Sequence, residues 1–144
     1  MNPPAAAGIY AKELLGFFAG MPRFDLILLG IGNDGHTASL FPGSAALDSQ
    51  EYACAVHVPQ LRSWRVTLTL PVLNNARTAI IVASGKEKAP IMEKLGDAGT
   101  SGDYPAGRIR LRDGEVIWLI DADAAMLMHV QHADKLKRTD EQKL

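Results

Sequence analysis

The chain has 144 residues, of which 47% are hydrophobic and 22% are charged. This length suits one ordinary domain, and the composition excludes a disordered or fibrous protein. A formal net charge of −1 provides no basic field, so neither nucleic acid nor a membrane surface is expected as a partner.

The N-terminal segment predicts a helix followed by a strand. Asn2 before Pro3 and Pro4 is typical of a helix start with a side-chain cap, and we expect this helix to run to about Gly20. Its expected apolar stripe comprises Ile9, Leu14, Phe17 and Phe18. The nearly continuous apolar run at residues 24–30 then indicates a strand covered on both faces, as in a parallel sheet.

Strands and helices alternate along the rest of the chain. Further strands are expected at residues 53–58, 64–70, 78–84 and 115–120, and helices at 71–76 and 86–96. This order predicts an α/β fold, with a mostly parallel, layered sheet flanked by helices. We expect one domain over residues 1–132 and a charged C-terminal tail over residues 133–144.

Nothing in the sequence indicates export. Lys12 and Glu13 interrupt the only apolar stretch near the N-terminus, and no run of about 18 apolar residues occurs. A single cysteine, Cys54 in an apolar run, fits a small buried side chain in a reducing compartment. A cytoplasmic protein is therefore expected.

The loop after the first strand reads GIGNDGH at residues 30–36 and matches the spacing G-x-G-x-x-G. A dinucleotide site also needs a long helix after the third glycine and an acidic residue after the next strand. Here Pro42 and Gly43 interrupt any helix, and the strand at 53–58 runs into VPQ without an acid. The dinucleotide interpretation is therefore rejected.

Two interpretations of this loop remain. In the first, glycines allow a tight turn at the carboxyl end of a parallel strand, where Asn33, Asp34 and His36 point into a crevice. In the second, Asn33 and Asp34 only form a turn and His36 caps a short following helix.

The string GIGNDGHTASLFPGS at residues 30–44 resembles the signature of 6-phosphogluconolactonases, within the group that includes glucosamine-6-phosphate deaminases. The resemblance extends over about residues 3–126, and further matching stretches lie at residues 64–77, 84–88, 104–110 and 118–125. The residues TASLFP after Asp-Gly-His are the lactonase form, whereas deaminases continue with an isoleucine or similar residue, then alanine, phenylalanine and asparagine.

This resemblance implies a modified Rossmann-like fold and hydrolysis of 6-phospho-D-glucono-1,5-lactone in the oxidative pentose phosphate pathway, without a metal or organic cofactor. His36 is the expected general base, because an imidazole takes up a proton near neutral pH. Asp34 either orients this imidazole or the substrate hydroxyls, or stabilises only the loop. Asn33, Gly32 and Gly35 are expected at the substrate, where the glycines leave room and nearby backbone amides donate to the developing oxyanion.

For the substrate phosphate, the resemblance indicates Arg65 and Lys88, with Lys86 as the rival of Lys88. Arginine offers a planar fork of donors and lysine a point charge, and both suit a phosphate dianion. The group Met126, Met128, His129 and His132 raises the question of a metal site. Helical spacing, without a cysteine or paired carboxylates nearby, indicates instead a core stripe with exposed histidines.

The sequence also departs from the family pattern. Family members begin with a further α/β segment that carries a Ser-Gly-Gly-rich phosphate loop, and they contain an Asp-Glu-Arg motif, so the fold is expected to be N-terminally truncated. The chain is then either the catalytic-histidine half of a lactonase or a catalytically incomplete domain that binds sugar phosphates or another partner. Missing strands would expose a sheet edge and an apolar face, which predicts self-association or a complementing N-terminal segment.

Overall fold

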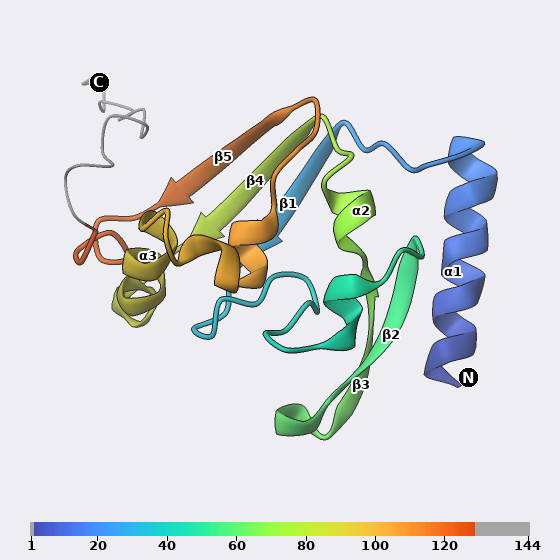
Figure 1. The fold of residues 1–144 in the computed structure, drawn as a ribbon, viewed down its shortest axis with the longest axis horizontal. Helices are drawn as coiled ribbons and strands as arrows, with labels where there is room; N and C mark the ends of the chain where they lie inside the picture. Colours follow the sequence, from blue (N-terminus) through green and yellow to red (C-terminus); the bar gives the residue numbers. More distant parts are fainter. Residues whose placement is uncertain (1, 129–144) are drawn as a thin grey trace, which may run out of the picture.

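The computed structural model describes residues 2–128 (Figure 1). The expected charged tail at residues 133–144, and His129 and His132, lie outside the described residues. Within residues 2–128, no helix is long and apolar enough to cross a bilayer.

Helix α1 (Pro3–Phe18) begins at the prolines, as predicted, but the expected side-chain cap is wrong. Asn2 makes no side-chain capping bond, and its backbone carbonyl accepts the first helical hydrogen bond from Ala6, at 3.0 Å. The predicted apolar stripe is buried only in part, since Leu14 is buried whereas Phe17 is exposed. The reason is that α1 packs against a small hairpin and leaves much of its apolar surface uncovered.

Three strands form a parallel sheet in the order β1 (Leu26–Gly30), β4 (Thr78–Ala83) and β5 (Glu115–Ile120). Their arrowheads in Figure 1 all point to the same edge of the sheet. Polar loops that follow the strands therefore meet at that edge, which is where α/β folds place their sites.

Strands β2 (Ala53–Val58) and β3 (Ser63–Leu68) form a separate antiparallel hairpin. The prediction of one layered sheet is therefore corrected, although the α/β class and the parallel sheet are confirmed. The physical reason lies in the connection, since the 3₁₀ turn Pro59–Leu61 is far too short for the crossover that parallel neighbours require.

The other two helices of residues 2–128 are short. After α1 come α2 (Leu70–Leu73) and α3 (Ala89–Gly96), and the 3₁₀ turn Lys86–Lys88 leads into α3. Pro90 stands in the first turn of α3, where the helix loses no hydrogen bond. The remaining 3₁₀ turns are Ala45–Asp48, Ser101–Asp103 and Pro105–Arg108.

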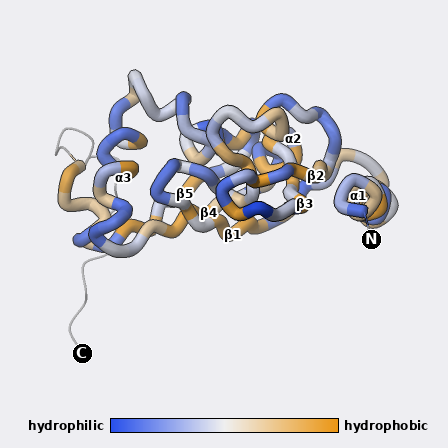
Figure 2. Tube along the Cα trace, turned by 90° about the horizontal axis from the view of Figure 1, so that it is seen from below, coloured by the Kyte–Doolittle hydropathy of each residue, from blue (hydrophilic) through white to orange (hydrophobic). Residues whose placement is uncertain are grey.

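The main core lies between one face of the parallel sheet, the hairpin and α2, and it includes Ile27, Leu29, Val58, Leu73 and Ile81. A second cluster packs the end of β4 against α3. In Figure 2 α2 lies above the strands of the sheet, and the lower side beside the labels β4 and β1 is coloured hydrophobic. The two faces of this sheet are thus covered unequally.

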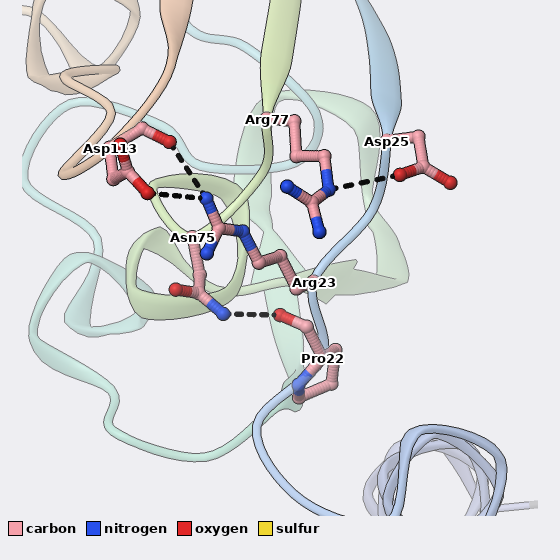
Figure 3. A network of polar contacts seen from close by, with 6 residues as sticks. All are labelled: Pro22, Arg23, Asp25, Asn75, Arg77 and Asp113. Carbon is pink, nitrogen blue, oxygen red and sulfur yellow. Dashed lines mark hydrogen bonds and ion pairs between the residues drawn. The ribbon is translucent and has the colours of Figure 1, made fainter.

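Charged residues join the segments that lead into the three parallel strands. Figure 3 shows this network, which comprises Pro22, Arg23, Asp25, Asn75, Arg77 and Asp113. Arg23 donates to the Asp113 carboxylate at 2.8 Å, and this arginine holds the pKa of Asp113 below its usual value. Arg77 contacts Asp25 at 3.1 Å. These pairs are exposed and contribute little energy, but they mark the end of the sheet opposite the glycine loop.

Candidate active site

The glycine loop follows β1 at the carboxyl edge of the parallel sheet. The Thr37 hydroxyl donates to the Gly30 carbonyl at 2.8 Å, and the Gly32 amide donates to the His36 carbonyl at 2.9 Å. The Gly35 amide donates to the Gly32 carbonyl at 2.9 Å, and Gly35 has a φ of 78°, which favours glycine. These bonds close a tight turn from which Asn33 and Asp34 project into solvent.

Asp34 and His36 form the central pair of the site. One carboxylate oxygen, Oδ1 of Asp34, lies 2.6 Å from Nδ1 of His36 and accepts the His36 backbone N–H at 3.1 Å. An ionised carboxylate can only accept, so Nδ1 carries the proton and Nε2 of the neutral imidazole is left with its lone pair.

The electrostatics of Asp34 follow from this contact. Partial burial raises the pKa of the carboxyl, but the hydrogen bonds from the His36 backbone and ring outweigh burial and leave the pKa below its usual value. Asp34 therefore stays ionised at neutral pH and remains the hydrogen-bond acceptor of the imidazole.

Phe41 fixes the other side of the imidazole. The two rings are stacked, with centroids 4.3 Å apart and planes at 28°, while the His36 side chain remains 32% exposed. Residues 37–40 form a turn closed by a bridge between Thr37 and Leu40 rather than a helix. The interpretation of His36 as a helix cap is therefore wrong.

The glycines make room for protein side chains rather than for open space. A Cβ atom on Gly32 would lie 2.1 Å from His36 Nδ1, and one on Gly35 would lie 2.7 Å from the Tyr104 ring. Both glycine amides already donate to backbone carbonyls. The amides of Gly32 and Gly35 themselves are thus engaged within the loop, and these glycines let His36 and Tyr104 pack closely.

Lys88 reaches the same loop from the end of β4. Its Nζ donates to Asn33 Oδ1 at 2.7 Å, across 55 residues of sequence. Lys86, the rival position, is exposed. The structure thus brings Asn33, Asp34, His36 and Lys88 together at one edge.

Asp121 supports the turn that carries Lys88. It follows β5 directly, and its carboxylate accepts from the Ser84 hydroxyl at 2.5 Å and from the Gly85 and Ala124 amides at 3.0 Å and 2.8 Å. The Ser84 hydroxyl is the main reason why the pKa of Asp121 lies below its usual value. Sequence reasoning missed this residue, although an acid at the carboxyl end of a parallel strand was the available signal.

Arg65 lies apart from these residues. Its guanidinium donates to the Ser63 hydroxyl at 2.9 Å, and no hydrogen bond or ion pair among residues 2–128 joins it to the glycine loop. Its strand nevertheless passes close by, since Thr67, two residues on, accepts the Ser39 amide at 3.1 Å. Arg65 therefore stands on a neighbouring strand without a hydrogen bond to the site.

An open recess of about 330 Å³ lies beside His36. Its lining residues are Leu28, Leu29, Gly30, Ile31, His36 and Ala38. In the part of the chain that the structure describes, no three His, Cys, Asp or Glu side chains gather into a group that could hold a metal ion.

The chain is similar to known proteins in both sequence and structure. Residues 1–118 match the family model described as glucosamine-6-phosphate isomerases/6-phosphogluconolactonase. The chain is 43% identical over 129 residues to 6-phosphogluconolactonase from Homo sapiens, an alignment that covers 87% of this chain and 50% of that protein.

Solved structures are also similar to this chain in fold and sequence. The structure titled devB protein is 35% identical, with a TM-score of 0.81, over 88% of this chain and 55% of that one. For 6-phosphogluconolactonase from Trypanosoma brucei the identity is 32% and the TM-score 0.74, over 86% of this chain and 53% of that one. The chain spans about half the length of the curated relatives it matches.

Proposed function

Because the chain belongs to the glucosamine-6-phosphate isomerase/6-phosphogluconolactonase family, we propose that it acts in hydrolysis of 6-phospho-D-glucono-1,5-lactone, with His36 as the general base. The 2.6 Å contact between Asp34 and His36 carries this proposal. This contact sets the tautomer of the imidazole, and the loop that carries it continues with TASLFP, the sequence form of the lactonases. Relatives that bear the name 6-phosphogluconolactonase favour this reaction over an isomerase reaction.

The reaction requires one water molecule and no redox step. Nε2 of His36 takes a proton from water as the water oxygen bonds to the lactone carbonyl carbon, and the carbonyl oxygen becomes an oxyanion. When the tetrahedral intermediate collapses, the bond from carbon to the ring oxygen breaks and His36 returns the proton to that oxygen. The products are a carboxylic acid and a free hydroxyl, so atoms and charge balance. Asp34 stabilises the imidazolium that forms between the two steps.

Lys88 is the proposed ligand of the substrate phosphate. Its ammonium group already makes a hydrogen bond to Asn33, so it lies on the loop that carries His36 and can exchange the amide for a phosphate oxygen. Arg65 belongs to the proposal as a second phosphate ligand from the neighbouring strand; it is exposed, and its guanidinium would exchange the local bond to Ser63 for the phosphate. We place the reaction in the cytoplasm, which the single free Cys54 supports.

One observation favours a second candidate function. In this second candidate function the chain binds the sugar phosphate without turning it over, since it spans only half the length of its relatives. A thermal shift with 6-phosphogluconate tests binding separately from catalysis, because a ligand of the native state raises the unfolding midpoint. No shift at millimolar ligand would count against both functions.

The test of hydrolysis uses freshly generated lactone and a measured background of spontaneous hydrolysis. The His36→Ala variant should lose roughly 10²-fold or more of the enzymatic rate. His57→Ala is the matched control, because His57 is exposed on the hairpin and contacts Trp64 instead of the glycine loop. Equal rates for wild type and His36→Ala would overturn the proposal.

A further inference from the structure

A segment about seventy residues further along the chain contacts the glycine loop. We call residues 104–110 the strap; they comprise the 3₁₀ turn Pro105–Arg108 and its flanks. The Ala106 amide donates to the Gly35 carbonyl at 3.0 Å. The Tyr104 ring packs against the same glycine, since a Cβ on Gly35 would lie 2.7 Å from it. In Figure 1 the strap is the orange segment beside the arrowhead of β1.

The strap holds the peptide unit that orients the Asp34–His36 pair. The Gly35 carbonyl and the His36 amide belong to one planar peptide unit, so fixing the first also fixes the direction of the second. The His36 amide donates to Oδ1 of Asp34 at 3.1 Å, and the same oxygen lies 2.6 Å from the imidazole. The bond from Ala106 therefore bears on both contacts within the pair.

The strap itself is anchored in the core. Ala106 is fully buried in the cluster that packs against α3, and Ile109 is buried in the main core. Between them, Nε of Arg108 donates to the Gly102 carbonyl at 3.1 Å. The strap thus has fixed positions on both sides of Gly107, and the glycine loop is held against it.

Asn74, at the end of α2, joins the strap to the rest of the fold. Its Nδ2 donates to the Arg108 carbonyl at 3.0 Å, and its Oδ1 accepts from the Arg110 amide at 2.8 Å. An amide side chain supplies a donor and an acceptor together, whereas an ionised carboxylate can only accept. Asn74 therefore satisfies one carbonyl and one amide of the strap at the same time.

We propose that Asn74 is a positioning residue for the proposed hydrolysis, because through the strap it fixes the Gly35–His36 peptide unit and with it the Asp34–His36 contact. Loss of the Asn74 amide would leave a carbonyl and an amide of the strap without their partners, so the strap would shift to satisfy them elsewhere. The kinetic consequence rests on the proposed function. The orientation of His36 is measurable without any turnover.

Asn75 provides a matched control. It is adjacent to Asn74 and also half-buried, and its Nδ2 donates to the Pro22 carbonyl at 2.9 Å (Figure 3). That bond lies at the end of the sheet opposite the glycine loop. Asn75→Ala therefore removes a hydrogen bond of the same kind without altering the strap.

The first experiment observes the His36 ring by ¹⁵N NMR on the full chain with labelled histidine. The shifts show which ring nitrogen carries the proton, and the His36 signals are those that His36→Ala lacks. At about pH 8.5, where an ordinary imidazole is neutral, wild type and Asn75→Ala should carry the proton on Nδ1. Asn74→Ala should show a mixture of both neutral tautomers. Tyr104→Ala, which removes the other contact of the strap with Gly35, should show the same mixture and serves if Asn74→Ala does not fold.

The second experiment measures lactone hydrolysis at neutral pH. Asn74→Ala should lower kcat roughly tenfold and change KM less than about twofold, because the base is displaced while the phosphate ligands are not. Asn75→Ala should retain the wild-type kcat, even if its unfolding midpoint falls as far as that of Asn74→Ala.

Two results would overturn the inference. One is a wild-type tautomer pattern in both Asn74→Ala and Tyr104→Ala. The other is an equal change in Asn75→Ala, which would assign the effect to general loosening of the fold. A wild-type chain that shows the expected tautomer patterns but no hydrolysis would contradict the proposed function and still support the role of Asn74 in orienting His36.

Discussion

At the scale of single residues, the site depends on two contacts made by one imidazole. The Asp34 carboxylate fixes the tautomer of His36, and the Phe41 ring fixes its plane. Both residues lie within five positions of His36, so a short loop supplies both of these contacts to the proposed base. A base that is already oriented loses less entropy when it meets the reacting water.

The first prediction concerns Gly32. Alanine at this position would place its Cβ 2.1 Å from His36 Nδ1 and 2.6 Å from Asp34 Oδ1, so the pair must separate. We expect Gly32→Ala to reduce lactone hydrolysis roughly 10²-fold in a steady-state assay. Gly16→Ala is the control, because a Cβ there meets nothing within 4 Å and Gly16 lies on α1, so its rate should stay close to wild type. Similar losses in both variants would contradict this account.

The second prediction concerns pH. The folded pKa of Asp34 lies below its usual value, so the unfolded chain binds the proton more tightly. The stabilisation is therefore complete above the unfolded carboxyl pKa of about 4 and is lost as the pH falls through the folded pKa. Between about pH 6 and about pH 3, the unfolding midpoint of wild type should fall more than that of Asp34→Asn.

Thermal melts followed by circular dichroism provide this measurement. Asp113 and Asp121 also have lowered pKa values, but they are present in both proteins, so their contributions cancel in the comparison. Parallel pH curves for the two proteins would show that the Asp34–His36 contact does not stabilise the fold.

At the scale of elements, the site is assembled where strands of the parallel sheet end. The loop after β1 brings His36, the turn after β4 brings Lys88, and the residue after β5 is Asp121. Asp121 ties the second of these segments to the third through Ser84 and Gly85. Gly85 has a φ of 96°, so the turn requires both a glycine and an external acceptor.

The third prediction tests Asp121 as a positioning residue. Asp121→Asn should weaken the bonds to Ser84 and Gly85 and loosen the turn that holds Lys88. We expect KM for the lactone to rise several-fold while kcat changes little, because phosphate binding is affected and the base is not. Asp123→Asn is a suitable control, since Asp123 is exposed. An equal fall in kcat and kcat/KM would place the effect at His36 instead.

At the scale of the whole molecule, the parallel sheet has one packed face and one face that residues 2–128 leave open. Neighbouring residues of the central strand β4 point to opposite sides, so Ile81 is fully buried while Val82 is 38% exposed. This asymmetry explains how a chain with a well-packed core also carries a large apolar surface.

The fourth prediction measures that asymmetry. Ile81→Ala should lower the free energy of unfolding by about 2–5 kcal/mol, because it leaves a cavity in the core. Val82→Ala should lower it by at most about 1 kcal/mol in the chain alone, because its side chain is already partly in water. Denaturant titration provides both values. A comparable loss in the two variants would show that the face of the sheet with Val82 is covered in solution.

The sequence by itself determined the strand positions, the α/β class and the family, because these depend on local apolar runs and on a contiguous motif. The pairing of β2 with β3 was also within reach, since a connection of a few residues permits only a hairpin. The tertiary structure alone decided which residues meet across the carboxyl edge, including Lys88 with Asn33 and Asp121 with Ser84.

It also decided what the glycines do. The family resemblance implies room for a substrate at Gly32 and Gly35, and the structure adds that a Cβ there would meet His36 or Tyr104, the latter about seventy residues further along the chain. The physical reason is the same in each case. Local sequence fixes backbone preference and the period of burial, but contacts between distant segments depend on strand order and on how loops fold over one another, which no short window encodes.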